Sequence, residues 1–353
     1  MRETTFWSWC PERAADRSRS TGLDLIHHRP FLNTDPPALA AIWNQSVPER
    51  SSVRPVLVHE LDEHAFGSVL FDRAGLIVAE RDGQIAGFVH AGFGPDLPVP
   101  DRPFEVNPEM GVIAMLAVAP GEGAQAIAEG LIVEAERYLR GRGAKVIYGG
   151  GQFPLNPFYW GLYSGAEASG APSSHAEFTG ALRALGYEPV STSVHLRFDL
   201  SRSEPRDPRS PILRRQAAVE IVEDAPPANW WENIALSDFH LTLARLVARA
   251  DGAEIARART WDMTWFGRLD GRTRLGIFDV FVSPEHRRKG CARFLMAGIF
   301  RAARDHGYDD AEVQTATANE PALALYQSLG FEPVEQSTVF RLPAPFPDRS
   351  RPE

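Results

Sequence analysis

The sequence of 353 residues has little cysteine and no long hydrophobic run. Its two cysteines, Cys10 and Cys291, lie far apart and offer neither a disulfide framework nor the paired spacing of a metal site. No uninterrupted apolar stretch reaches the length of about 18 residues that a helix needs to cross a bilayer. We therefore expect a protein without structural disulfides, a bound metal ion or a membrane span.

Positive charge is also in the minority. The chain has 37 Lys and Arg against 46 Asp and Glu, a formal net charge of -9. Because nucleic-acid binding requires a concentrated basic face, this balance disfavours such a partner. Residues 1–21 contain arginines but neither the apolar core nor the cleavage site of a secretory signal, so they predict a mobile leader and a cytoplasmic location.

One segment of the sequence occurs twice. "LGYEPVSTSVHLRF" at 185–198 returns as "LGFEPVEQSTVFRL" at 329–342, with seven identical positions. This repeat, in a chain about twice the roughly 150 residues of a typical domain, indicates a tandem duplication. The polar, proline-bearing stretch between the copies is typical of a linker. The predicted divisions are a leader 1–21, a first domain 22–200, a linker 201–215, a second domain 216–343 and a tail 344–353.

The two halves show the same order of predicted elements. In each, a strand hairpin precedes a long buried strand, an amphipathic helix and a further strand. These elements are expected at 74–94, 111–120, 128–139 and 145–151 in the first half, and at 253–267, 274–284, 292–303 and 311–318 in the second. The repeated segment is expected to supply the last two strands of each half. The fold class is α/β, with a mixed sheet of about six or seven strands and flanking helices in each half.

The junction after the long strand of the second half, "VFVSPEHRRKGCARFLM", carries the pattern R-x-x-G-x-A as Arg287, Gly290 and Ala292. The glycine lets the backbone turn so that successive N–H groups point into one concavity, and the following helix adds the positive end of its dipole. Arg288 and Lys289 add full positive charge. These features predict a pyrophosphate-binding loop.

A short helix downstream begins at Asn319, a typical N-cap, with Pro321 in its first turn. Tyr326 follows in the same helix, just before the turn at Gly330. Together with the loop, this order and spacing resembles the GCN5-related N-acetyltransferase (GNAT) family over about residues 275–342. The two-domain layout is similar to that of the mycothiol synthase family.

The resemblance implies how the second half would bind acetyl-CoA. The backbone at Phe281 and Val282 would pair with the pantetheine arm, and the amides of Arg287–Ala292 would hold the pyrophosphate. Asn319 would contact the cofactor arm. Tyr326 would act as general acid toward the leaving thiolate, since a phenol with its ordinary pKa of about 10 is a fair acid toward a thiolate. The alternative is a tyrosine that only fills space beneath the last strands.

The general base is not identified by this pattern. The family often places a glutamate where this chain has Gly276, and Asp279, three residues on, has the opposite strand parity. Asp279 is kept as a candidate base, alongside a water molecule and His286. Cys291 lies inside the loop without an indicated histidine partner, so its amide and not its thiol is expected to serve.

The first half has lost most of this chemistry. Its junction, "GEGAQAIA", lacks the basic residues and includes Glu122, which would repel a pyrophosphate. A gap-free alignment on the strand end pairs Gly123 with Arg287 and Ala126 with Gly290. Counting back from the repeated segment pairs His175 with Asn319 and Leu182 with Tyr326. Because the tyrosine is absent, the first half is predicted to be catalytically degenerate.

An aromatic insertion distinguishes the first half. The spacing from Ala128 to Gly186 exceeds that from Ala292 to Gly330 by 20 residues. The inserted stretch contains Phe153, Phe158, Tyr159, Trp160 and Tyr163 among prolines and glycines. Such a loop predicts either a lid or substrate-binding wall, or a plug that packs the two domains together.

The sequence thus predicts an acetyl-CoA-dependent N-acetyltransferase that acts on the amine of a small metabolite or amino-acid-like acceptor through its second half. Two alternatives remain open: a non-catalytic acyl-CoA-binding regulatory module, and a peptide or protein N-acetyltransferase. The duplication also predicts that the halves pack together as an intramolecular pseudo-dimer.

Overall fold

The computed structural model describes residues 26–95, 106–152, 155–156, 158–203, 207–227, 230–236 and 239–347. The expected leader 1–21, Phe153 of the insertion and residues 348–353 of the tail lie outside these ranges. Within them, no helix combines the length and apolar character needed to cross a bilayer. The helices are α1 (Pro36–Ser46), α2 (Val58–Leu61), α3 (Ala124–Gly141), α4 (Ala176–Ala184), α5 (Ser210–Gln216), α6 (Trp230–Leu236), α7 (Cys291–Asp305) and α8 (Glu320–Leu329).

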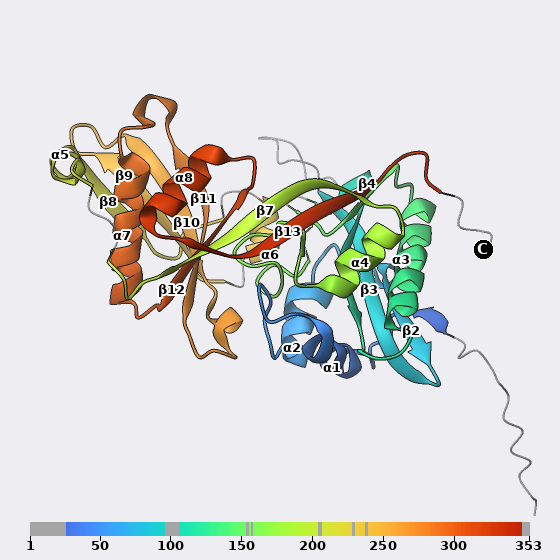
Figure 1. Ribbon diagram of the computed structural model, residues 1–353. Helices are drawn as coiled ribbons and strands as arrows, with labels where there is room; N and C mark the ends of the chain where they lie inside the picture. The colour runs from blue at the N-terminus through green and yellow to red at the C-terminus, as the bar shows by residue number, and fades with distance from the viewer. Residues whose placement is uncertain are drawn as a thin grey trace, which may run out of the picture.

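The strands of the described residues form one continuous 13-stranded sheet that spans both halves (Figure 1). They are β1 (His27–Pro30), β2 (Leu76–Arg81), β3 (Gln84–Pro95), β4 (Val106–Val118), β5 (Val146–Gly149), β6 (Ala171–Pro172), β7 (Glu188–Asp199), β8 (Ala217–Val222), β9 (Leu241–Ala248), β10 (Glu254–Asp262), β11 (Arg274–Val282), β12 (Asp310–Ala316) and β13 (Glu332–Leu342). Their order is β1-β2-β3-β4-β5-β13-β7-β12-β11-β10-β9-β8, and β6 pairs with β13. The sheet is therefore larger than the one expected for each half.

The predicted repeat of one α/β plan is confirmed. In the first half, β2 and β3 form a hairpin at Asp82 and Gly83, whose φ angles of 54° and 73° suit a tight turn between twisted strands. Strand β4, helix α3 and strand β5 form a parallel crossover, and β11, α7 and β12 form its counterpart. Each half thus has its long buried strand beside a shorter parallel one.

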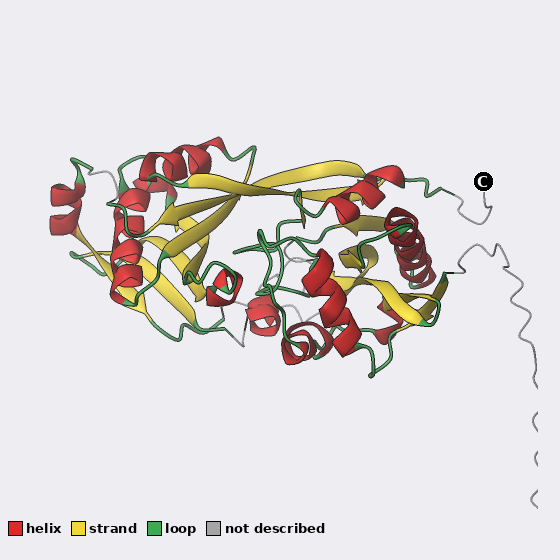
Figure 2. Ribbon diagram, turned by 60° about the horizontal axis from the view of Figure 1, so that its bottom comes forward, coloured by secondary structure: helices red, strands yellow, loops and turns green. Residues whose placement is uncertain are grey.

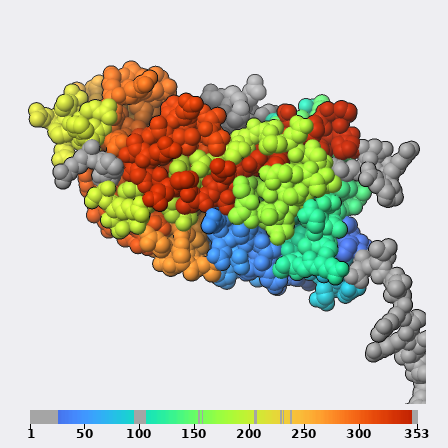
Figure 3. Space-filling model, viewed as in Figure 1, coloured from blue at the N-terminus to red at the C-terminus, as the bar shows by residue number. Residues whose placement is uncertain are grey.

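The two halves exchange their last strands. Strand β7 of the first half lies between β13 and β12, and β13 of the second half lies between β5 and β7 (Figures 1 and 2). The repeated segments therefore pair with each other in antiparallel register, and Ser193 lies opposite Ser337, its own counterpart in the repeat. In Figure 3, residues of the C-terminal segment, in red, run along one face toward yellow-green residues of the first half.

The prediction that each repeated segment makes two strands is wrong. Residues 188–198 and 332–342 contain no Gly, Asn or Asp that would form a tight turn, so each continues as one long strand. The division into 22–200 and 216–343 consequently separates each half from the strand that completes its sheet. Part of the expected linker 201–215 is also ordered, because α5 begins at Ser210.

The exchange places side chains of one half in the core of the other. Phe198 on β7 stacks against Phe300 of α7 with ring centroids 4.7 Å apart, and it also contacts Phe331. In the opposite direction, Phe340 and Leu342 of β13 are buried in the first-half core. Hydrophobic burial of this kind is non-directional, so the core accepts an apolar strand from either half.

A buried polar network surrounds His195 at the centre of the exchange. Its Nδ1 lies 2.8 Å from Ser51 Oγ and 2.9 Å from Gln314 Nε2, while Nε2 lies 2.6 Å from Ser337 Oγ. Gln314 Nε2 can only donate, so Nδ1 accepts and the proton of the neutral ring is on Nε2. Burial lowers the pKa of His195 to about 4. The network thus requires an uncharged imidazole.

Mild acid is expected to destabilise the fold. Burial lowers the pKa of His90 and of His175 to about 3, and that of His195 to about 4. Unfolded histidines have a pKa of about 6.5, so below this value the unfolded chain binds protons that the folded chain excludes. Stability is fully present above about pH 6.5 and is lost as the pH falls toward the folded values.

Denaturant unfolding at neutral pH and at about pH 5 measures this loss. In the variant His195→Gln, which cannot take up a proton at this position, a smaller loss is expected over the same interval. Equal stability of the wild-type protein at both pH values would contradict the prediction.

Candidate active site

A cleft opens in the second half where two parallel strands separate. Strand β11 pairs with β12 only as far as Ile277 and Val313. Beyond these residues β11 continues beside β10 and β12 continues beside β7, so the two strands diverge. The resulting cleft has a volume of about 940 Å³, which lies in the range of about 300–1,000 Å³ typical of small-molecule sites.

Three elements line this cleft: the end of β11, the loop into α7, and α8. They bring together nine of the predicted cofactor and catalytic residues, namely Phe281, Val282, Arg287, Arg288, Gly290, Cys291, Ala292, Asn319 and Tyr326. Lys289 and Asp279 are not among the described residues that line it. The residues chosen from the two sequence motifs thus meet in one place, although the motifs are separated in the chain.

The loop before α7 has the backbone shape of an anion site. Arg288 has φ 60° and Gly290 has φ 89°, so the chain turns twice through the left-handed region before the helix begins. The first helical hydrogen bond runs from the Phe294 N–H to the Gly290 carbonyl at 3.0 Å. The amides of the preceding turn are those that a helix leaves without an intrahelical acceptor. The residues that carry these amides line the cleft, beside the positive end of the α7 dipole.

Two arginines that the sequence did not single out also reach the cleft. Arg209, in the expected linker, donates from Nη1 to the Arg288 carbonyl at 3.4 Å and pairs with Asp207 at 2.8 Å. Arg293, in the first turns of α7, lies 3.8 Å from the same Asp207 carboxylate. Both line the cleft beside Arg287. Arg209 could not be found from its position because only the fold brings the linker against the loop.

Tyr326 projects from α8 into the cleft. The helix has the expected ends, since the Asn319 side chain accepts from the Ala322 N–H at 3.4 Å and Gly330 has φ 95° at the C-terminus. Tyr326 is 5% exposed. Burial raises the pKa of its phenol, and the negative charge of Glu167 raises it further. The side chain therefore remains protonated at neutral pH and can donate its proton.

The other candidate side chains are placed less favourably for chemistry. Asp279 lies at a β-bulge with φ 47°, and its Oδ2 accepts from Arg257 Nε at 3.0 Å. It is thus engaged in an ion pair at the strand edge and does not line the cleft. Burial raises the pKa of the Cys291 thiol, which disfavours a reactive thiolate.

The equivalent loop of the first half is shorter. Helix α3 begins after Gly123, which has φ 78° as Gly290 has 89° before α7. Gly123 follows the end of β4 at Val118 by five positions, whereas Gly290 follows the end of β11 at Val282 by eight. The gap-free pairing of Gly123 with Arg287 is therefore wrong, and Gly123 corresponds to Gly290. The first half lacks the short turn at Pro284–His286 that extends the loop.

The two pairs counted back from the repeated segment agree with the helices. His175 precedes α4 as Asn319 precedes α8, and Leu182 occupies the Tyr326 position. Leu182 packs so closely against Gly149 that a Cβ built there would lie 2.5 Å from its Cδ2. An apolar side chain thus fills the space at the end of β5 where the second half has its phenol.

The aromatic side chains of the insertion are buried. Phe158, Tyr159, Trp160 and Tyr163 are between 0% and 5% exposed and belong to a core cluster that contains residues of both halves. Trp160 packs edge-on against Phe278 of β11, with centroids 5.9 Å apart. This burial is what the packing alternative predicts. These four side chains are not among the described residues that line the cleft.

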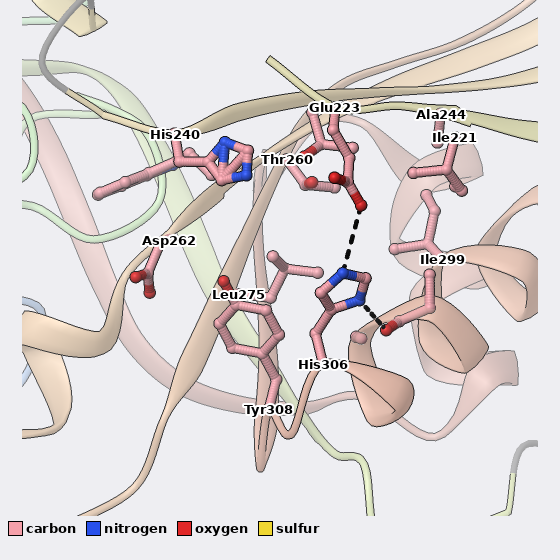
Figure 4. Close-up of a pocket in the computed structure, with 14 residues that line it drawn as sticks. Ile221, Glu223, His240, Ala244, Thr260, Asp262, Leu275, Ile299, His306 and Tyr308 are labelled. Atoms are coloured by element: carbon pink, nitrogen blue, oxygen red, sulfur yellow. Dashed lines mark hydrogen bonds and ion pairs between the residues drawn. The ribbon is translucent and has the colours of Figure 1, made fainter. Parts of the chain in front are cut away.

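A second cavity lies between β9, β10 and α7 (Figure 4). His306 at its rim contacts Glu223 Oε1 at 3.3 Å and the Ala302 carbonyl at 2.8 Å. Its volume of about 90 Å³ is well below the about 300 Å³ at which small-molecule pockets begin. The larger cleft is therefore the better candidate for a cofactor site.

The fold and the cleft define a duplicated α/β protein whose second half has a left-handed loop before helix α7 at the cleft. The sequence model described as the Acetyltransferase (GNAT) family matches residues 38–164 and 211–331, which together make up more than half of the chain. The chain therefore belongs to the acetyltransferase (GNAT) family, and it contains two copies of the domain.

Known proteins show the same relationship. The chain is similar to N-acetyltransferase 8 of Homo sapiens, with 45% identity over 64 residues that cover 18% of this chain and 28% of the relative. The chain thus spans less than a third of the length of that curated protein. Among solved structures it resembles a tandem GNAT protein from the clavulanic acid biosynthesis pathway, with a TM-score of 0.59, 15% identity and coverage of 90% and 98%.

A second solved structure is the GCN5-related glucosamine N-acetyltransferase region of a fungal multi-domain β-N-acetylglucosaminidase. Its TM-score is 0.64 at 16% identity, and the match covers 91% of this chain and 38% of that one. Both structural likenesses support the tandem fold alone.

Proposed function

We propose that this protein is an acetyl-CoA-dependent N-acetyltransferase whose second half transfers an acetyl group to the amine of a small metabolite or amino-acid-like acceptor. The observation that carries the proposal is the convergence of the β11 end, the left-handed loop at Gly290 and the Tyr326 phenol on one cleft. The strand backbone can polarise the thioester carbonyl, the loop can hold the pyrophosphate, and the phenol can protonate the leaving thiolate.

Each element of the cleft has a role in this proposal. Acetyl-CoA supplies the reactive thioester. The loop amides, with Arg287 and Arg288, would hold the pyrophosphate, and the β11 edge at Phe281 and Val282, which β12 leaves uncovered, would pair with the pantetheine arm. Tyr326 would give its proton to the departing sulfur.

A small acceptor is favoured over a peptide. The buried aromatic cluster of the first half packs against Phe278 of β11, two positions before Val280, where the lining of the cleft begins on this strand. A concave cleft of about 940 Å³ suits a small molecule. The names of the relatives, an N-acetyltransferase and a glucosamine N-acetyltransferase region, agree with an amine acceptor.

Calorimetric titration of acetyl-CoA into the full chain tests the cofactor assignment. We expect one binding site, weakened about ten-fold or more by Arg288→Glu, since a charged contact becomes a repulsion. Gly290→Val is expected to abolish binding because a β-branched residue is strained at φ 89°.

Gly123→Val is the matched control, since it introduces the same strain at the equivalent N-cap of the first half. It is expected to leave the affinity unchanged. Loss of binding in Gly123→Val but not in Gly290→Val would move the site to the first half. No binding to the wild-type protein would overturn the function.

A further inference from the structure

The strand position that often carries the family's base is closed to any side chain here. A Cβ built on Gly276 would lie 2.6 Å from Trp261 Nε1 and 2.6 Å from Met263 Sδ, so neither neighbour leaves space. Trp261 lies opposite Gly276 on β10 and fills the position. A base must therefore come from another element.

The indole that closes this position also holds a loop of the first half. Trp261 Nε1 donates to the Ala166 carbonyl at 3.0 Å. Gln314 of β12 contacts the same loop twice, since its Nε2 donates to the Ser164 carbonyl at 2.6 Å and its Oε1 accepts from the Glu167 N–H at 3.1 Å. Side chains of β10 and β12 thus fix residues 164–167 from both sides.

These contacts place the backbone of Glu167 beside the point where β11 and β12 diverge, although Glu167 is not among the described residues that line the cleft. Gln314 is the first residue of β12 beyond its last pair with β11, Val313 with Ile277. The loop backbone at Glu167 is therefore anchored where the two strands begin to diverge. The insertion of the first half therefore contacts two strands, β10 and β12, that flank β11.

The carboxylate of Glu167 has no hydrogen bond or ion pair with any residue that the structure describes. The side chain is partly buried. Two other acids near this loop are paired, Glu312 with Arg197 at 2.9 Å and Asp279 with Arg257 at 3.0 Å. Glu167 is thus the acid of this group that remains available to a ligand.

Two charge effects connect Glu167 with the cleft. The Glu167 charge raises the pKa of Tyr326, which lines the cleft. Burial and then the charge of Asp279 raise the pKa of Glu167 to about 8. The carboxylate therefore lies within electrostatic range of both α8 and β11, and it can take up a proton near neutral pH.

We propose that Glu167, contributed by the first half, is the general base that deprotonates a cationic amine acceptor in the cleft of the second half. This inference rests on the proposed acetyltransferase function. It gives the degenerate half a direct part in the reaction, because its insertion supplies a group that β11 has no room to carry. An unpaired carboxylate also attracts an ammonium group, so the acceptor class is a primary amine that is charged in solution.

The proton transfers balance without a further reactant. The ammonium gives one proton to the Glu167 carboxylate, and the neutral nitrogen attacks the thioester carbonyl. The N–C bond forms and the C–S bond breaks, while Tyr326 gives its proton to sulfur. The nitrogen then loses a second proton to solvent. Before the next turnover, the tyrosinate takes up a proton from solvent, and Glu167 releases to solvent the proton that it accepted.

Acetyl transfer to glucosamine, lysine and ethylamine, measured with the full chain from about pH 6 to about pH 9, tests this role. In the wild-type protein the rate is expected to rise with pH along an ascending limb whose apparent pKa is about 8, because the base must be unprotonated. Glu167→Gln is expected to remove the limb and lower kcat about 10²-fold, with acetyl-CoA affinity unchanged. Asp279→Asn is expected to shift the limb to lower pH, since it removes a charge that raises the pKa of Glu167.

A weakly basic acceptor separates proton removal from a structural role. At a pH where ethylamine is charged, trifluoroethylamine is largely neutral and has no extra proton to lose before it attacks. Glu167→Gln is therefore expected to slow acetyl transfer to trifluoroethylamine much less than transfer to ethylamine. An equal loss with both amines would overturn the assignment, as would full activity of Glu167→Gln.

One measurement does not depend on any acceptor. Carbon-13 NMR of glutamate-labelled protein, with Glu167→Gln to identify the signal, is expected to show Glu167 titrating near 8. An ordinary value, near 4.3, would overturn the inference. If the wild-type protein binds acetyl-CoA but transfers the acetyl group to no amine, the proposed function is wrong. If it is active and Glu167→Gln has no effect, only the assignment of Glu167 as the base is wrong.

Discussion

Phe198→Ala is expected to destabilise the second half by about 3–5 kcal/mol, although Phe198 belongs to the first half of the sequence. The ring is 2% exposed and stacks on Phe300 of α7. Removing the ring leaves a cavity beside Phe300 and Phe331 in the core of the second half. Denaturant unfolding gives the loss, and hydrogen exchange should show it in α7 and β12.

Two variants serve as controls for this prediction. Phe340→Ala removes a buried ring of β13 and should instead loosen the first-half core around α3 and α4. Val190→Ala lies on the same strand as Phe198 but is 44% exposed, so it should change stability little. We propose that the halves depend on each other as an intramolecular pseudo-dimer. A loss in Phe198→Ala that is confined to the first half would contradict this proposal.

Tyr326→Phe is expected to lower kcat by about 10²–10³-fold, within the range for loss of a general acid. The ring and its packing are retained, so the melting temperature and the affinity for acetyl-CoA should remain close to wild type. Burial raises the pKa of the phenol, which keeps the proton in place until a thiolate appears. Steady-state kinetics together with calorimetry separates the chemical step from binding.

Tyr308→Phe is the matched control, because it removes the same hydroxyl from the small cavity away from the cleft. It should leave kcat unchanged. Full activity of Tyr326→Phe would show that water protonates the leaving thiolate, and the tyrosine would then be a packing residue of α8.

The residues that meet in the cleft of the second half could largely be predicted from local sequence. The left-handed turn before α7 favours glycine at position 290, Asn319 caps helix α8, and Tyr326 follows at a fixed helical spacing. Each of these constraints acts within a few residues, so each can be recognised in a single sequence. The same reasoning fails for the first-half loop, because a deletion of three positions shifts Gly123 out of a gap-free alignment.

The sequence by itself determined that the chain is a duplication of one α/β fold, that the second copy carries the R-x-x-G-x-A loop, and that the first copy lacks the tyrosine. Only the tertiary structure decided which strand completes which sheet, because β7 and β13 are so alike that the pattern of either fits both places. It also decided the position of Glu167, whose anchors Trp261 and Gln314 lie about a hundred or more residues away. Hydrogen bonds between such distant residues are set by how the halves pack, and no local spacing in the sequence records them.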